Sequence, residues 1–216
     1  MKRVLLLPLV LPLFLLLAGC DSGMEKQQKA VISTNFGDIT IVLFNSTPKH
    51  RDNFIKLVNE GFYSDLLFHR VIEGFMIQGG DPGSKNAAPG QPLGAGGPGY
   101  EIDAEIGAPH LRGALAAARN TNPEKRSSGS QFYIVTGKPI SEQELQGIER
   151  SKNITYNEVQ RQRYLETGGA PFLDMDYTVF GEVVTGMDVV DKISKAPRDP
   201  RDRPLEDIKF TIKLVK

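Results

Sequence analysis

Residues 68–80 read FHRVIEGFMIQGG, and most of this stretch has the pattern of a buried β-hairpin. Two apolar runs flank Glu73-Gly74, and Phe, Val and Ile are frequent in strands, so the pattern predicts a β-hairpin. Arg70 and Gln78 interrupt the two apolar runs. Burying a guanidinium without partners costs several kcal/mol, and burying an unpaired amide costs about 1–3 kcal/mol. The hairpin must therefore provide partners for both polar groups.

The register of this hairpin decides whether the two polar side chains meet. A two-residue turn at Glu73-Gly74 would place Arg70 and Gln78 on opposite faces of the sheet. A three-residue connection over 73–75, or a bulge, would pair Arg70 directly with Gln78. Because the Gln oxygen can accept a hydrogen bond from the guanidinium, we predict the second register. The alternative is that Arg70 lies on a solvent-facing side of the sheet.

The composition is that of an ordinary globular protein. The chain has 216 residues, of which 40% are hydrophobic and 24% charged, and this is enough for one good-sized domain. Lys plus Arg and Asp plus Glu both number 26, so no basic excess indicates nucleic-acid binding. The single Cys excludes an intrachain disulfide.

The N-terminus reads MKRVLLLPLVLPLFLLLAGC, with two basic residues followed by an apolar run that ends at Ala18. The run is short for a membrane span, which needs about 20 apolar residues, and Pro8 and Pro12 would kink a helix. A transmembrane anchor is the alternative. The order of basic residues, apolar run and LAGC resembles the signal and lipobox of bacterial lipoproteins.

That resemblance implies a signal peptide over residues 1–19 and lipid attached to Cys20. Residues 20–29 would then be a short lipidated tether to the membrane. The implied location is the bacterial cell envelope, outside the cytoplasm, facing the periplasm or the cell surface. The sequence leaves the choice between inner membrane, outer membrane and surface open.

The remaining residues, 30–216, are expected to form one β-rich domain. Alternating or continuous apolar patterns predict strands at 30–34, 38–44, 130–137, 177–184 and 207–216. A helix is expected to begin with Thr47 as N-cap and Pro48 at its first position, and another helix over 187–193. Seven or eight strands with two flanking helices suggest a closed barrel.

Residues 138–171 differ in character from their surroundings. Two capping boxes, Ser141 with Glu144 and Thr155 with Glu158, predict two short helices there. We interpret the segment as a helical insertion into the β-rich domain.

The sequence lacks the motifs of several classes of enzyme and binding site. GAGGPG at 94–99 has the spacing of a dinucleotide fingerprint, but no strand precedes it and no helix follows. The residues His50, His69 and His110 are scattered, and we expect them at the surface or the edge of the core rather than as metal ligands. No nucleophile elbow is present. A hydrolase or a metalloenzyme is therefore not expected.

Three motifs follow one another along the chain: FHRVIEGFMIQGGD at 68–81, GALAAARNTNPEKRSSGSQFYI at 113–134 and FLDMDYTVFGEVVTGMDVVDKI at 172–193. Together they resemble the cyclophilin family of peptidyl-prolyl cis/trans isomerases. The resemblance implies a mostly β fold, an eight-stranded antiparallel closed barrel capped by two helices, with the helical insertion added. It also implies a reaction that uses no cofactor and no metal.

The barrier to rotation of an Xaa-Pro bond, about 18–20 kcal/mol, comes from conjugation of the nitrogen lone pair with the carbonyl. A site that binds the twisted amide better than the planar one lowers this barrier. The resemblance implies that Arg70 is the catalytic donor to the proline nitrogen. Gln78 would hold Arg70 or the substrate backbone, and Phe75 and Met76 would belong to the proline pocket.

The resemblance extends to further substrate-binding positions. These are Ala118, Arg119, Asn120, Gln131, Tyr133, Phe172, Leu173 and Tyr177. Phe172 stands where the best-known members have Trp, whose indole N–H is a donor, so we expect weak binding of the family's inhibitor cyclosporin. The Tyr133 hydroxyl is expected to narrow the substrate range, and the 138–171 segment is expected to border the site.

Two functions remain open at this point. The first is a lipid-anchored isomerase that assists the folding of exported proteins. Its partners would be proline-containing peptides, unfolded exported proteins and the membrane through Cys20, with no nucleic acid. The second is a proline-peptide binding module or chaperone whose isomerase activity is incidental. The presence of Arg70 favours the first, because binding alone does not need that donor.

Overall fold

The structure, a computed structural model, describes residues 26–215. The proposed signal peptide and Cys20 lie outside the described residues. Within the described part of the chain, no helix has both the length and the apolar character needed to cross a bilayer.

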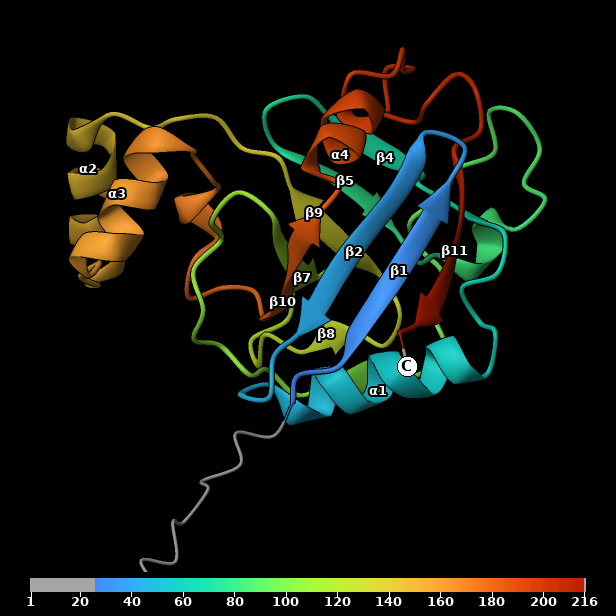
Figure 1. The fold of residues 1–216 in the computed structure, drawn as a ribbon, viewed down its shortest axis with the longest axis horizontal. Helices are drawn as coiled ribbons and strands as arrows, with labels where there is room; N and C mark the ends of the chain where they lie inside the picture. The colour runs from blue at the N-terminus through green and yellow to red at the C-terminus, as the bar shows by residue number, and fades with distance from the viewer. Residues whose placement is uncertain (1–25, 216) are drawn as a thin grey trace, which may run out of the picture.

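Nine antiparallel strands form one curled sheet, in the order β3-β11-β1-β2-β10-β7-β9-β5-β4. A separate two-stranded sheet pairs β6 with β8, of which β8 is labelled in Figure 1. The strands are β1 Lys29–Thr34, β2 Gly37–Leu43, β3 Leu66–Leu67, β4 Arg70–Ile72, β5 Met76–Gly79, β6 Glu101–Ile102, β7 Ala114–Ala117, β8 Ser127–Ser128, β9 Phe132–Val135, β10 Val179–Thr185 and β11 Lys209–Leu214.

Four α-helices accompany the sheet, with α1 and α4 close to it and α2 and α3 set to one side (Figure 1). Their bounds are α1 Pro48–Asn59, α2 Glu142–Lys152, α3 Glu158–Glu166 and α4 Met187–Ser194. Two short 3₁₀ helices, Pro82–Ser84 and Pro171–Leu173, lie in connecting segments.

The prediction of an eight-stranded closed barrel is wrong. The sheet has two edge strands, β3 and β4, which are successive in the chain and are joined by Phe68 and His69. The chain changes partner at this junction, because the Phe68 N–H donates to Ile208 O and the His69 N–H donates to Gln78 O. The short strand β3 thus pairs with β11, and the short strand β4 pairs with β5. The two edges of the sheet are joined by the chain between β3 and β4, and not by strand pairing.

The main core fills the inside of the curled sheet beneath α1. Phe54 of α1 packs against the rings of Tyr63, Phe132 and Phe180, at centroid separations of 5.1, 5.9 and 5.6 Å. The alternating pattern at the C-terminus forms β11 as predicted, with Phe210 among the buried residues of the same core. This core packs against one face of the strands, including β5 and β9, that carry the candidate site.

The beginning of α1 differs from the prediction. The helix starts at Pro48 as expected, but the side chain of Thr47 makes no capping hydrogen bond. The carboxylate of Glu105 instead accepts the backbone N–H groups of Lys49 and His50, both at 3.0 Å. A distant loop therefore supplies the negative charge that a helix N-terminus favours.

The segment 138–171 contains two helices, α2 and α3. Ser141 and Glu144 form the predicted capping box of α2. The box predicted at Thr155 is wrong, since Asn157 caps α3 and pairs reciprocally with Gln160. The cap therefore lies two residues later than the sequence pattern suggested.

Candidate functional site

The hairpin of β4 and β5 has the predicted register. Arg70 lies opposite Gln78, and the three-residue connection contains Gly74 with a φ of +71°. This left-handed conformation suits glycine, which has no side chain to clash. Arg70 Nη1 donates to Gln78 Oε1 at 3.4 Å, so the two polar groups are partners as expected.

A chain of amides continues from this pair. Gln78 donates to Gln131 Oε1 at 3.2 Å, and Gln131 donates to the carbonyls of Gly94 and Gly96 at 2.9 and 2.7 Å. The Gly-rich loop is thereby joined to Gln131, the residue just before β9. Asp81 accepts the Gly94 and Gly96 N–H groups from the other side, which holds the loop in place.

Arg70 stands at the edge of a hollow of about 230 Å³. Its side chain is 42% exposed, and its Nε lies 3.7 Å from the Asp202 carboxylate. The residues that line the hollow are Arg70, Phe75, Met76, Gln78, Gly94, Ala118, Arg119, Asn120, Tyr133, Leu173 and Tyr177. All the predicted site residues in the described part of the chain belong to this lining except Gln131 and Phe172.

The two exceptions lie next to the hollow. Gln131 lines an adjoining hollow of about 320 Å³, which also includes Gln78 and Arg119. Phe172 is 53% exposed and its ring lies 5.4 Å from that of Phe75. Phe172 therefore extends the apolar rim rather than the inner wall.

The walls combine apolar and cationic groups. Met76 and Tyr133 are almost fully buried, and Tyr177 meets Tyr133 edge to face at 6.1 Å. The guanidinium of Arg119 lies 4.7 Å from the centre of the Tyr177 ring. A compact apolar ring could thus be held against the aromatic wall while Arg70 reaches a polar atom beside it.

Residues 29–213 match the family model described as cyclophilin type peptidyl-prolyl cis-trans isomerase/CLD. The chain belongs to the cyclophilin family. It is accordingly an enzyme, a cyclophilin-type peptidyl-prolyl cis-trans isomerase.

Relatives of this cyclophilin occur in several organisms. A protein of Staphylococcus aureus (strain USA300), provisionally named a peptidyl-prolyl cis-trans isomerase, is 36% identical over 181 residues, 83% of this chain and 87% of the relative. A Streptococcus pyogenes protein, provisionally named a bifunctional phosphatase/peptidyl-prolyl cis-trans isomerase, is 39% identical over 185 residues, 83% of this chain but 37% of the relative.

Solved structures resemble the cyclophilin as well. The crystal structure of a Cryptosporidium parvum cyclophilin type isomerase has a TM-score of 0.63 and 26% identity, covering 88% of this chain and 99% of that one. A second structure of that protein, in the presence of the dipeptide Ala-Pro, has a TM-score of 0.62.

The histidines of this cyclophilin are not where we expected them. His50, His69 and His110 are all buried, with exposures of 2%, 4% and 0%. Burial lowers the pKa of His50, and burial lowers the pKa of His69 to about 4. Residues 26–215 contain no group of three or more His, Cys, Asp or Glu placed to hold a metal ion.

Sequence reasoning missed a connection between the cyclophilin's site and its interior. The Tyr133 hydroxyl lies 3.0 Å from Nε2 of His110, and Nδ1 of His110 lies 2.7 Å from Asp174. Asp174 lies within a motif that we used for the resemblance, but neither residue received a role. No spacing rule links positions this far apart, so only the fold could bring them together.

Proposed function

We propose that the hollow beside Arg70 binds the proline ring of a peptide, and that Arg70 donates a hydrogen bond to the prolyl nitrogen as the amide twists. The position of Arg70, beside an apolar wall and held by Gln78, is the observation that carries this proposal. The relative from Cryptosporidium parvum has a structure in the presence of Ala-Pro, a dipeptide of the kind the hollow would take.

The physical argument concerns the nitrogen lone pair. In the planar amide this pair is delocalised into the carbonyl, and it localises on nitrogen as the bond rotates. A donor fixed near the nitrogen therefore stabilises the twisted form more than the planar form. A donor on the carbonyl oxygen would have the opposite effect, which makes the placement of Arg70 relative to the ring decisive.

The surroundings of Arg70 restrict its motion. Gln78 accepts from Nη1, and the Asp202 carboxylate lies 3.7 Å from Nε. With both sides of the guanidinium held, its remaining N–H groups are available toward the hollow, and little reorganisation is needed when substrate binds.

The test follows cis-to-trans conversion of a short Ala-Pro peptide by the full chain in detergent. Arg70→Ala is expected to lower kcat/KM by about a hundredfold, and Arg70→Lys should recover only part, since Lys lacks the planar fork. Arg150→Ala, on an exposed position of α2, is the matched control and should behave as wild type. Equal rates for Arg70→Ala and wild type would overturn the proposed role of Arg70. Peptide binding without acceleration by wild type would instead favour the binding-module alternative.

We further propose that the enzyme acts outside the cytoplasm on exported proteins, held to a membrane by lipid on Cys20. The basic residues, apolar run and LAGC of residues 1–20 support this placement. Metabolic labelling with radioactive palmitate should label the wild-type chain in the membrane fraction of a bacterial host. Cys20→Ala should remain unlabelled. Labelling of Cys20→Ala, or a wild-type chain that stays unlabelled, would contradict the proposed anchor.

A further inference from the structure

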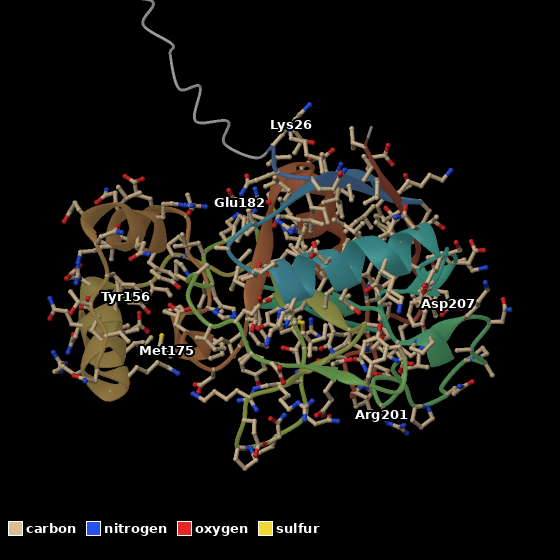
Figure 2. The ribbon with its side chains drawn as sticks, turned by 90° about the horizontal axis from the view of Figure 1, so that it is seen from below. Lys26, Tyr156, Met175, Glu182, Arg201 and Asp207 are labelled. Atoms are coloured by element: carbon tan, nitrogen blue, oxygen red, sulfur yellow. The ribbon has the colours of Figure 1, made fainter. Side chains whose placement is uncertain are left out.

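The two ends of the helical segment 138–171 meet each other and join the body of the domain at the same place. Gly169 forms bridges with both Leu111 and Lys138, and the Ala170 N–H donates to His110 O at 2.8 Å. Figure 2 shows Tyr156 at the junction between α2 and α3, and Met175 on the segment between this helical pair and the sheet. The insertion and the site thus share the connection that runs from 169 to 177.

Asp174 joins the insertion to the body of the domain. Its side chain is almost fully buried, and each of its oxygens has two donors within reach. Oδ1 lies 2.7 Å from the backbone N and from Nδ1 of His110. Oδ2 accepts the hydroxyls of Tyr156 and Tyr164, both at 2.7 Å. A buried carboxylate with four hydrogen bonds is strongly constrained, because losing any one of them leaves charge uncompensated.

Both insertion tyrosines act as donors in this arrangement. Burial is the main cause that raises the pKa of Tyr156 and of Tyr164, and Asp174 adds to it, so the hydroxyls stay protonated. The two rings contact each other at 5.0 Å and share a small apolar cluster with Leu111 and Leu145. The insertion therefore holds the Asp174 carboxylate from one side, and the body of the domain holds it from the other.

His110 carries this constraint to the wall of the hollow. Its Nδ1 faces a carboxylate oxygen, which can only accept, so this nitrogen bears a proton. On the other side of the ring, Nε2 lies 3.0 Å from the Tyr133 hydroxyl. The His110 ring also stacks on Tyr133 at 6.0 Å and meets Tyr177 edge-on at 6.3 Å. Both aromatic walls of the hollow thus rest on one histidine.

A second connection runs from the insertion to Arg119, another residue that lines the hollow. Lys152, in the last turn of α2, pairs with Asp176 at 2.5 Å. The Asp176 carbonyl accepts from Nε of Arg119 at 2.8 Å, and Arg119 covers the Tyr177 ring. The insertion therefore contacts residues that support the hollow at two separate places.

We propose that the 138–171 insertion is a positioning brace for the proline pocket, acting through Tyr156, Tyr164, Asp174 and His110 to fix the Tyr133 ring. This inference rests on the proposed function of the hollow. Tyr133 is then a specificity-determining residue, since the brace sets how large a ring fits between it and Arg70. The tyrosines and Asp174 are positioning residues, because they act on the substrate only through His110.

The first experiment removes the insertion's two hydroxyls and keeps both rings, in the full chain. The double variant Tyr156→Phe, Tyr164→Phe should lower kcat/KM for an Ala-Pro peptide about tenfold, with most of the change in KM. It should also discriminate less between proline and the six-membered analogue pipecolic acid. Tyr63→Phe is the matched control, because it removes a buried hydroxyl that donates to Ser130 O outside this network. An unchanged KM and unchanged discrimination in the double variant would overturn the proposal.

A double-mutant cycle separates positioning from a general loss of stability. In a Tyr133→Phe background the link to His110 is already broken, so removing the two insertion hydroxyls should change kcat/KM by less than twofold. Additive effects on kcat/KM would contradict the brace. Failure of the brace can be told apart from failure of the proposed pocket. If Arg70→Ala retains wild-type activity, the proposed function fails. If only the tyrosine variants retain wild-type KM and discrimination, the brace alone fails.

Discussion

Arg70 and Asp202 form an ion pair between β4 and the loop that precedes β11, with 3.7 Å between Nε and Oδ2. The Asp202 carbonyl accepts the Val71 N–H at 2.9 Å, which fixes the loop beside β4. Asp202 also pairs with Arg198 at 3.2 Å, so two cations share one carboxylate. The loop therefore takes part in orienting the group that we propose as the donor.

We predict that Asp202→Asn lowers kcat/KM by about two- to fivefold, the scale of a partly exposed ion pair of roughly 0.5–1 kcal/mol. Asn is suitable because the residue has a φ of +65°, which Asn tolerates. Peptide isomerisation at low ionic strength measures the effect, and Arg198→Ala is the control that spares the Arg70 contact. A variant as active as wild type would show that Gln78 alone orients Arg70.

The contact of Glu105 with the start of α1 predicts a stability effect. Glu105→Ala removes the acceptor of two helix N–H groups and of His50 Nδ1, which lies 2.7 Å from the carboxylate. We expect the free energy of unfolding to fall by about 1–2 kcal/mol, as for other lost helix caps. Urea denaturation measures the change. Glu60→Gln, at an exposed position near the other end of α1, should shift the midpoint little.

His69 predicts a loss of stability in mild acid. Its ring nitrogens are buried, and neither has a hydrogen-bond partner among the described residues. Burial lowers the folded-state pKa to about 4 from an unfolded value of 6.5, so the unfolded state binds the proton first. Stability is therefore fully present above pH 6.5 and falls as the pH drops toward about 4, by on the order of 3 kcal/mol.

Denaturant midpoints measured between pH 7 and pH 4 test this dependence. In His69→Gln, the loss of stability that comes from protonation of His69 should disappear. Titration of acidic residues will account for the pH dependence that remains. A wild type and variant with parallel pH profiles would argue against a neutral buried His69.

Phe172 predicts weak cyclosporin binding. Its exposed ring at the rim offers no N–H donor, whereas Trp would. We expect wild type to bind more weakly than about 1 μM, and Phe172→Trp to gain about tenfold, the value of one good hydrogen bond. Fluorescence titration or calorimetry measures both. A nanomolar dissociation constant for wild type would show that Phe172 does not limit affinity. Phe172→Tyr keeps the ring size and adds a hydroxyl, so it tests whether a donor without a larger ring raises affinity.

The local elements of the fold could be predicted because they depend on neighbouring residues. The pairing of Arg70 with Gln78 followed from strand periodicity and a three-residue connection, and the Ser141 capping box from a four-residue pattern. The cap of α1 could not be predicted, because Glu105 lies more than fifty residues away from the helix that it caps. Local patterns also could not predict whether the barrel closes. Closure depends on which strands pair with the two halves of 66–72.

By itself, the sequence determined the hairpin, the candidate site residues and the presence of a helical segment at 138–171, because periodicity, turn chemistry and motif order are local properties. Only the tertiary structure decided that Asp174 and His110 connect this segment to Tyr133. Buried hydrogen bonds of this kind join residues that are distant in sequence, and their energy depends on burial and distance, which exist only once the sheet has curled.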